Sequence, residues 1–132
     1  MLQGIYVMHL LDTHTLLWYL RDSEELSETA RRTIDNAEDV FVSVASLWEI
    51  AIKQSIGKLR IDISIVELEA LCQERDIRVL RILPMALERI KTLPHIHGDP
   101  FDRILVAHAM TENMSIITRD RVIAQYQVAT IW

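Results

Sequence analysis

Apolar and polar positions follow two different periods along the chain, and the alternation between them predicts strands separated by helices. Short uninterrupted apolar runs are typical of strands that are buried on both faces. Segments with apolar residues three and four positions apart are typical of helices with one buried face. We expect strands at 6–11, 39–43, 77–82, within 115–120 and at the end of the chain. We expect helices at 13–21, 27–37, 44–58, 63–76, 84–93 and 98–113, and a helical turn after residue 121.

The residues at several predicted helix ends support these boundaries. Ser27 and Asp99 are of the types that cap helix N-termini. Pro84 and Pro100 occupy first-turn positions, where a proline removes no intrahelical hydrogen bond. Gly57 lies where the preceding helix is expected to end.

The order of the elements indicates an α/β fold with a parallel sheet. Strands that alternate with helices pair in parallel and are covered by helices on both faces. At 132 residues the chain is long enough to form one domain over residues 1–132. Residues 1–7 fit either an N-terminal extension or the start of the core.

Composition argues against several other classes of protein. Hydrophobic residues make up 50% of the chain and charged residues 25%, which is an ordinary globular balance. The single cysteine, Cys72, is expected to be buried and allows neither a disulfide framework nor a Cys-rich zinc site. The N-terminal segment has no basic region and reaches a charge at Asp12, so we expect neither a signal peptide nor a membrane span. We therefore expect a cytoplasmic protein.

The charge balance restricts how the chain can bind nucleic acid. It has 14 Lys and Arg residues against 19 Asp and Glu residues, a net charge of −5. Because nucleic-acid binding usually needs a basic face, an RNA partner requires bound cations or a local group of arginines at the contact. Arg103, Arg119 and Arg121 lie beside acidic residues, and their guanidinium groups are candidates for gripping RNA phosphate.

Acidic residues occur where ligands collect in open parallel sheets, beyond the carboxyl ends of the strands. Asp12 follows the first strand, and Asp120 follows the strand that contains "SIIT". Each of them also fits an N-cap of the helical segment that comes next. Asp99 has the strongest purely structural explanation, because "DPFD" is typical of a helix start.

Two further acids lie inside predicted helices, where a carboxylate is costly unless it has a partner. Asp102 projects along an apolar stripe of its helix. Glu49 either forms an exposed ion pair with Lys53 one turn later or faces inward and needs another partner. If four carboxylates meet at one end of the sheet, shifted pKa values or a bound cation must neutralise them. Oxygen ligands without paired Cys or His residues favour Mg²⁺ or Mn²⁺ over zinc.

Four segments, in this order and spacing, resemble the PIN-domain family, specifically the VapC-like toxins of bacterial type II toxin–antitoxin pairs. They are "LLDTHTLLWYL", "VSVASLWEIAIKQSIGKL", "HGDPFDRILVAHA" and "IITRDRVIAQY", and the likeness spans nearly the whole chain. The resemblance implies a three-layer α/β/α sandwich with a central, mostly parallel sheet. It also implies an Mg²⁺- or Mn²⁺-dependent endoribonuclease that hydrolyses RNA phosphodiester bonds, with a cognate antitoxin as partner and a homodimeric state.

The same resemblance assigns roles to residues of this chain. The acids that would bind metal and act in catalysis are Asp12, Glu49, Asp102 and Asp120, with Asp99 as an auxiliary metal ligand. The hydroxyl residues that would support them are Thr13, Ser46 and Thr118. Asp120 stands at the family's most variable metal position, so the direct contact falls to either Asp120 or Asp99.

Two other functional classes fit part of the pattern. A magnesium-binding phosphatase or phosphoacceptor would also place an Asp after its first strand. A phosphatase of the Asp-x-Asp type needs a second acid where this chain has His14, and a receiver domain needs a lysine where it has Arg119. A binding module of the same fold without catalytic activity is the second alternative, and the complete set of acids argues against it.

The remaining histidines and the tryptophans have structural explanations. We expect His14 on a helix surface, His95 and His97 in loop structure without a metal, and His108 packed or hydrogen-bonded in its helix. We expect Trp18, Trp48 and Trp132 to be core or interface anchors.

Overall fold

A computed structural model of the chain describes residues 7–132. The strands are β1 (Met8–Leu11), β2 (Asp39–Ser43), β3 (Ile77–Leu80), β4 (Ser115–Ile117) and β5 (Thr130–Ile131). The helices are α1 (Thr13–Leu20), α2 (Glu28–Asn36), α3 (Val44–Ser55), α4 (Ile65–Glu74), α5 (Pro84–Ile90), α6 (Pro100–Glu112) and the 3-10 turn η1 (Ile123–Gln125). Every expected element is present, with ends shifted by a few residues. Residues 1–6, most of the proposed N-terminal extension, lie outside the described residues.

The five strands form one sheet in the order β3-β2-β1-β4-β5, and all of the paired strands are parallel. The chain builds the sheet from β1 toward β3 and then returns to the other side of β1 to add β4 and β5. The switch point of this topology therefore lies between β1 and β4, and open α/β sheets bind ligands beyond the carboxyl ends of strands at such a point.

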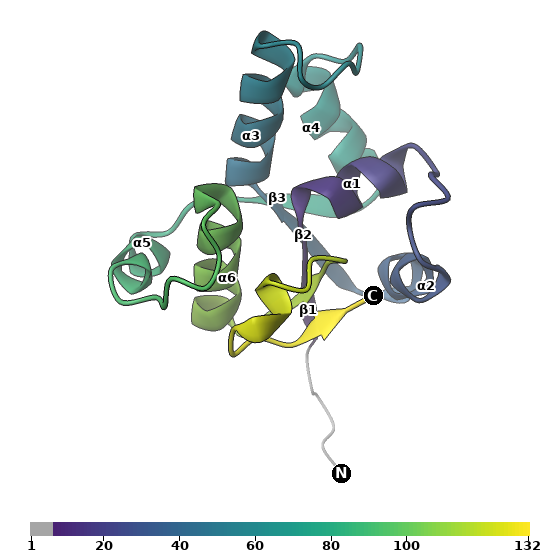
Figure 1. Cartoon of the computed structure of the whole chain (residues 1–132). Helices are drawn as coiled ribbons and strands as arrows, with labels where there is room; N and C mark the ends of the chain where they lie inside the picture. The colour runs from purple at the N-terminus through teal and green to yellow at the C-terminus, as the bar shows by residue number, and fades with distance from the viewer. Residues whose placement is uncertain (1–6) are drawn as a thin grey trace.

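Helices cover both faces of the sheet, so the expected three-layer sandwich is confirmed. Figure 1 shows α5 and α6 on one side of the strands and α1 to α4 on the other. Leu11 and Val42 belong to a core shared with α1, α2, α3 and α4. Their neighbours Leu10 and Ile116 point to the opposite face, where they pack with α6 and η1. Strands buried on both faces explain the uninterrupted apolar runs in the sequence.

The predicted helix signals act as expected. The side chains of Ser27 and Asp99 accept hydrogen bonds from backbone N–H groups in the first turns of α2 and α6. Pro84 and Pro100 begin α5 and α6. Gly57 has φ +73, just after the end of α3, a conformation in which other residues are strained.

Small side chains let α3, α5 and α6 approach one another. Ala45, Ala86 and Ala107 form a buried cluster with Ile104 between these helices. The close contact places the first two turns of α3 beside the N-terminus of α6, although the two segments are far apart in the sequence. Among the helices within residues 7–132, none has both the length and the hydrophobicity needed to cross a membrane.

Candidate metal site

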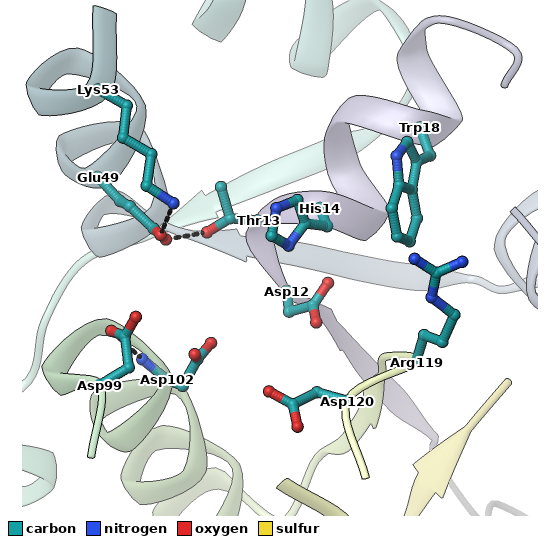
Figure 2. Close-up of a pocket in the computed structure, with 10 residues that line it drawn as sticks. All are labelled: Asp12, Thr13, His14, Trp18, Glu49, Lys53, Asp99, Asp102, Arg119 and Asp120. Carbon is teal, nitrogen blue, oxygen red and sulfur yellow. Dashed lines mark hydrogen bonds and ion pairs between the residues drawn. The ribbon is translucent and has the colours of Figure 1, made fainter. Parts of the chain in front are cut away.

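A cavity of about 220 Å³ opens at the carboxyl ends of β1 and β4. Its lining comes from α1, α3, the start of α6 and the turn after β4, as Figure 2 shows. The residues that line it are Asp12, Thr13, His14, Trp18, Glu49, Lys53, Asp99, Asp102, Arg119 and Asp120. All five acids singled out in the sequence thus face a single cavity.

Asp12 is buried at the seam between β1 and α1 and has two roles in its local structure. Its Oδ1 accepts a hydrogen bond from the backbone N–H of Thr15 at 2.9 Å, so it does cap α1. Its Oδ2 accepts a hydrogen bond from the hydroxyl of Thr118, which follows the neighbouring strand β4. The cap and the cross-strand contact together fix the orientation of a carboxylate that lines the cavity.

Glu49 faces inward from α3 and is buried. The Thr13 hydroxyl donates a hydrogen bond to its Oε1 at 2.7 Å. The Lys53 ammonium group donates to its Oε2 at 2.7 Å, so the ion pair considered from the sequence exists, but at the cavity wall and not on an outer surface. Ser46 Oγ lies 2.9 Å from the Thr13 hydroxyl oxygen and extends this network.

Asp99 and Asp102 begin α6 at the opposite wall of the cavity. Asp99 Oδ1 accepts the backbone N–H of Phe101 at 2.8 Å and caps the helix. Burial raises the pKa of Asp102 to about 7, and the negative charges of Asp99, Asp12 and Glu49 add to this increase against an opposing contribution from His97. The carboxylates that share the cavity thus add to the effect of burial and disfavour the ionisation of Asp102.

Asp120 is held in the turn after β4. Its Oδ1 accepts the backbone N–H of Val122 at 2.8 Å, and its own N–H donates to the Thr118 hydroxyl at 2.9 Å. Burial works against its ionisation, but hydrogen bonds from His97 and from the backbone of Val122 and Ile123 outweigh burial and hold its pKa below the usual value. Asp120 is therefore an ionised carboxylate at neutral pH.

His97 lies in a loop, as expected from the sequence, but it contacts two acids of the cavity. Its Nε2 lies 2.8 Å from Asp120 Oδ2 and 3.2 Å from Asp102 Oδ2. Ligand atoms of these three residues lie within 4.8 Å of one another. No third His or Cys lies near His95 and His97 in the chain, so the sequence does not indicate these contacts with two acids on different elements. The position of His97 two residues before the capping Asp99 was the available signal.

The donor set suits a hard divalent cation. Five carboxylates line the cavity, and the positively charged side chains of its lining are Lys53, which pairs with Glu49, and Arg119, which pairs with Glu25. Asp12 and Glu49 lie outside the 4.8 Å cluster, toward the walls formed by α1 and α3. An excess of carboxylate oxygens with one partly buried acid of raised pKa is an arrangement that a bound divalent cation would neutralise.

The three arginines predicted to contact phosphate have different positions. Arg119 lines the cavity, and its guanidinium group lies 4.5 Å from the centre of the Trp18 ring. Arg121 is exposed but outside the cavity lining. The prediction for Arg103 is wrong, because the side chain is buried and its guanidinium group donates to the carbonyl oxygens of Leu93 and Pro94.

Several aromatic predictions also need adjustment. His14 is exposed and stacks on Trp18, and both line the cavity. His108 is completely buried, and neither of its ring nitrogens has a hydrogen-bond partner among the described residues, so it is packed and not hydrogen-bonded. Trp48 is 60% exposed and contacts Phe101 edge to face, which excludes a core position. Trp132 is half-buried and packs on Trp18.

Comparisons with known proteins find a curated relative and solved structures of the same fold. A curated relative, Ribonuclease VapC22 of Mycobacterium tuberculosis, is 27% identical over 128 residues, which cover 93% of this chain and 97% of that protein. DNA-bound VapBC2 of Rickettsia felis superposes with a TM-score of 0.65 at 10% identity, over 95% of this chain and 98% of that chain. DNA-bound VapBC of Salmonella typhimurium gives a TM-score of 0.65 at 16% identity, over 95% and 97%.

The two structural likenesses are at low identity and bear on the fold, which they share over nearly the full length of this chain. The family model described as the PIN domain matches residues 9–129, a range that contains every acid of the cavity. This chain therefore belongs to the PIN-domain family.

Proposed function

We propose that the chain is a metal-dependent endoribonuclease and the toxin of a type II toxin–antitoxin pair. The observation that carries the proposal is the meeting of Asp12, Glu49, Asp102 and Asp120 in one cavity, from four separate parts of the chain. The relative named Ribonuclease VapC22 supports the reaction class. Carboxylates gathered at the switch point of an open parallel sheet are well suited to bind a cation beside a phosphodiester.

Asp12, Glu49 and Asp102 would hold Mg²⁺ or Mn²⁺, with Asp120 or Asp99 completing the ligand set. A bound divalent cation would supply Lewis acidity toward an attacking water and the scissile phosphate. Thr118 orients Asp12 by hydrogen bonding to its Oδ2. Thr13 does the same for Glu49, and Ser46 supports Thr13. Hydroxyls that orient metal ligands in this way affect metal affinity without touching the metal.

Arg119 is the arginine best placed to contact an RNA phosphate beside the carboxylates. It lines the cavity, and its current partner Glu25 is itself exposed, with 2.7 Å between the paired atoms. An exposed ion pair contributes little stability, so the guanidinium group can exchange the Glu25 carboxylate for a phosphate at small cost. Arg119 also supplies a local positive charge at the cavity, which RNA binding requires in a chain of net charge −5.

A cognate antitoxin, a homodimeric state and a cytoplasmic location complete the proposal. The solved structures that share this fold include the VapBC assemblies and FitAcB of Neisseria gonorrhoeae. A small reading frame that overlaps the start of this one would support the antitoxin. Light scattering of the purified chain measures the oligomeric state, and a monomer at micromolar concentration would contradict the homodimer.

Cleavage of RNA by purified protein tests the function. We expect cleavage with Mg²⁺ or Mn²⁺, no cleavage with EDTA, and a loss of at least about 100-fold in Asp12→Asn, since changes behind the metal ligands alone cost roughly 10–100-fold. Asp62→Asn is the matched control, because Asp62 is exposed and outside the cavity. Equal cleavage by both variants would refute the site. Metal binding without any cleavage would favour the inactive binding module.

A further inference from the structure

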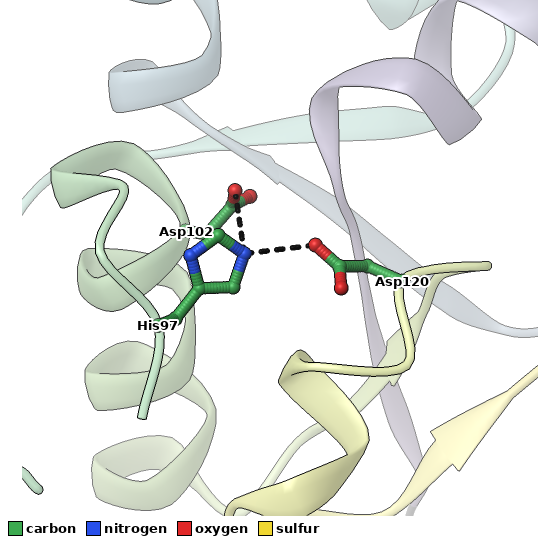
Figure 3. Close-up of side chains that lie close together, drawn as sticks. All are labelled: His97, Asp102 and Asp120. Carbon is green, nitrogen blue, oxygen red and sulfur yellow. Dashed lines mark hydrogen bonds and ion pairs between the residues drawn. The ribbon is translucent and has the colours of Figure 1, made fainter. Parts of the chain in front are cut away.

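His97 lies between Asp102 and Asp120, two of the acids that line the cavity. Its Nε2 is within hydrogen-bonding distance of Oδ2 of both Asp102 and Asp120, as Figure 3 shows. The backbone that carries the ring is held by the fold, because the buried Tyr126 hydroxyl accepts the backbone N–H groups of Ile96 and His97 at 3.1 and 2.8 Å. The loop that carries His97 is thus anchored to the segment after β4, on which Asp120 also lies.

The hydrogen bond at the other ring nitrogen determines which atom of His97 carries the proton. The backbone N–H of Asp99 donates to His97 Nδ1 at 3.0 Å. A neutral imidazole has one donor and one acceptor nitrogen, so an accepting Nδ1 places the ring hydrogen on Nε2. His97 therefore donates its Nε2–H to Asp120 Oδ2 at 2.8 Å, with Asp102 Oδ2 3.2 Å from the same nitrogen, and it has no lone pair at Nε2 to offer a metal.

We propose that His97 is a positioning residue that competes with the metal: its Nε2–H joins Asp102 to Asp120 and occupies the carboxylate oxygens that a cation would take. The inference rests on the proposed metal site and adds that His97 lowers the affinity of this site for the cation. Binding of a cation at these two oxygens must break the hydrogen bond to Asp120 and displace the contact with Asp102, and hydrogen bonds to charged groups are among the stronger ones in proteins.

Removal of the donor is expected to strengthen metal binding. Asp120 keeps its place without His97, because Val122 N–H and the Thr118 hydroxyl hold it independently. Asp102 keeps its place because it is part of α6. The loss of His97 would thus leave two nearby carboxylates without their shared donor, which raises the free energy of the metal-free site and favours the cation.

Calorimetric titration of the purified metal-free chain with Mn²⁺ alone tests whether His97 competes with the cation. We expect the Kd of His97→Ala to be about tenfold lower than that of the wild type, the change that corresponds to one hydrogen bond to a charged group. His97→Gln retains an N–H donor and should stay within about threefold of the wild type. His95→Ala, at an exposed position on the same loop, is the matched control and should leave the Kd unchanged.

Pulsed electron paramagnetic resonance of Mn²⁺ bound to the wild type gives a second measurement that needs no variant to fold. We expect no directly coordinated ¹⁴N signal. A coordinated ¹⁴N signal, or weaker Mn²⁺ binding by His97→Ala, would make His97 a ligand and overturn the competition. An unchanged Kd in His97→Ala would also overturn it, while the metal site itself would stand. A wild type that binds no Mn²⁺ would instead refute the proposed function.

Discussion

The two ends of the central sheet differ in how far their carboxylates are paired with cations. At the amino end of β2, Asp39 is buried and forms an ion pair with Arg78 of the neighbouring strand β3. Asp39 and Arg78 thus neutralise each other within the chain. At the carboxyl ends of β1 and β4, five acids line a cavity whose own cations are Lys53 and Arg119.

We propose that this difference separates a structural acid from a functional one. A buried carboxylate is expected to have a partner, and Asp39 satisfies that expectation within the chain. The cavity acids outnumber their partners, and the pKa of Asp102 is raised to about 7 as a result of burial and of the neighbouring acids. Excess charge that the fold leaves uncompensated indicates a site for a cation from solution.

The largest effect is expected from substitutions that break the Asp39–Arg78 ion pair at the amino end of β2. Arg78→Met leaves the Asp39 carboxylate buried without a cation, and we expect a loss of about 3 kcal/mol in the free energy of unfolding. Asp39→Asn removes the charge and leaves an arginine that is already 64% exposed, so we expect a loss of about 1 kcal/mol. Urea unfolding measures both. A change in Mn²⁺ affinity in either variant would contradict the separation of the two ends.

Removal of one cavity acid should instead increase the free energy of unfolding of the metal-free protein. The pKa of Asp102 is about 7 in the folded chain and near 3.8 when unfolded, so its stabilising contribution is present below about pH 4 and lost as the pH rises through 7. Asp102→Asn should therefore stabilise the metal-free protein at pH 8 by about 2 kcal/mol and have little effect at pH 4. Thermal unfolding in EDTA measures this difference, and Asp62→Asn is the control. Destabilisation at pH 8 would show that the acids are not in excess.

The same acid makes metal binding depend on pH. Below pH 7 a proton on Asp102 competes with the cation, so the observed Kd for Mn²⁺ should rise by up to about tenfold for each pH unit between 7 and 5. Calorimetric titration across this range measures the slope. Asp102→Asn should bind more weakly at pH 7 and show a flatter profile, whereas a wild-type Kd independent of pH would remove Asp102 from the ligand set.

The smallest effect is expected at the cavity rim. Arg119→Ala should raise the KM for RNA by about threefold and leave kcat nearly unchanged, because an exposed charge contributes at most about 1 kcal/mol to a contact. Arg121→Ala is the control, since Arg121 is exposed but outside the cavity lining. Steady-state cleavage of a short fluorescent RNA separates the two constants. Equal effects of both substitutions would assign phosphate binding to the general surface and not to the rim.

Local signals predicted the elements because their physical causes are local. Ser27 and Asp99 cap helices through backbone groups within three residues, and Pro84 begins a helix because its own ring sets φ. The joint position of Asp12 and Asp120 was also foreseeable, since both follow parallel strands and the carboxyl ends of such strands share one edge.

Contacts between distant segments could not be foreseen in the same way. Arg103 follows Asp102 directly, yet it points to the carbonyl oxygens of Leu93 and Pro94 because adjacent helix positions face different directions. His97 reaches Asp102 and Asp120 from a loop whose backbone is anchored by the distant Tyr126. The Arg103 contact has no periodic or sequential signal, and the signal for His97 is limited to its position two residues before the capping Asp99.

The sequence by itself determined the alternation of strands and helices, the helix caps and the set of acids at the strand ends, because these depend on neighbours along the chain and on the shared direction of parallel strands. Only the tertiary structure decided the strand order, the inward orientation of Glu49, the place of His97 among the acids and the burial of Arg103. Those features depend on which surfaces pack together, and the packing is a property of the whole core.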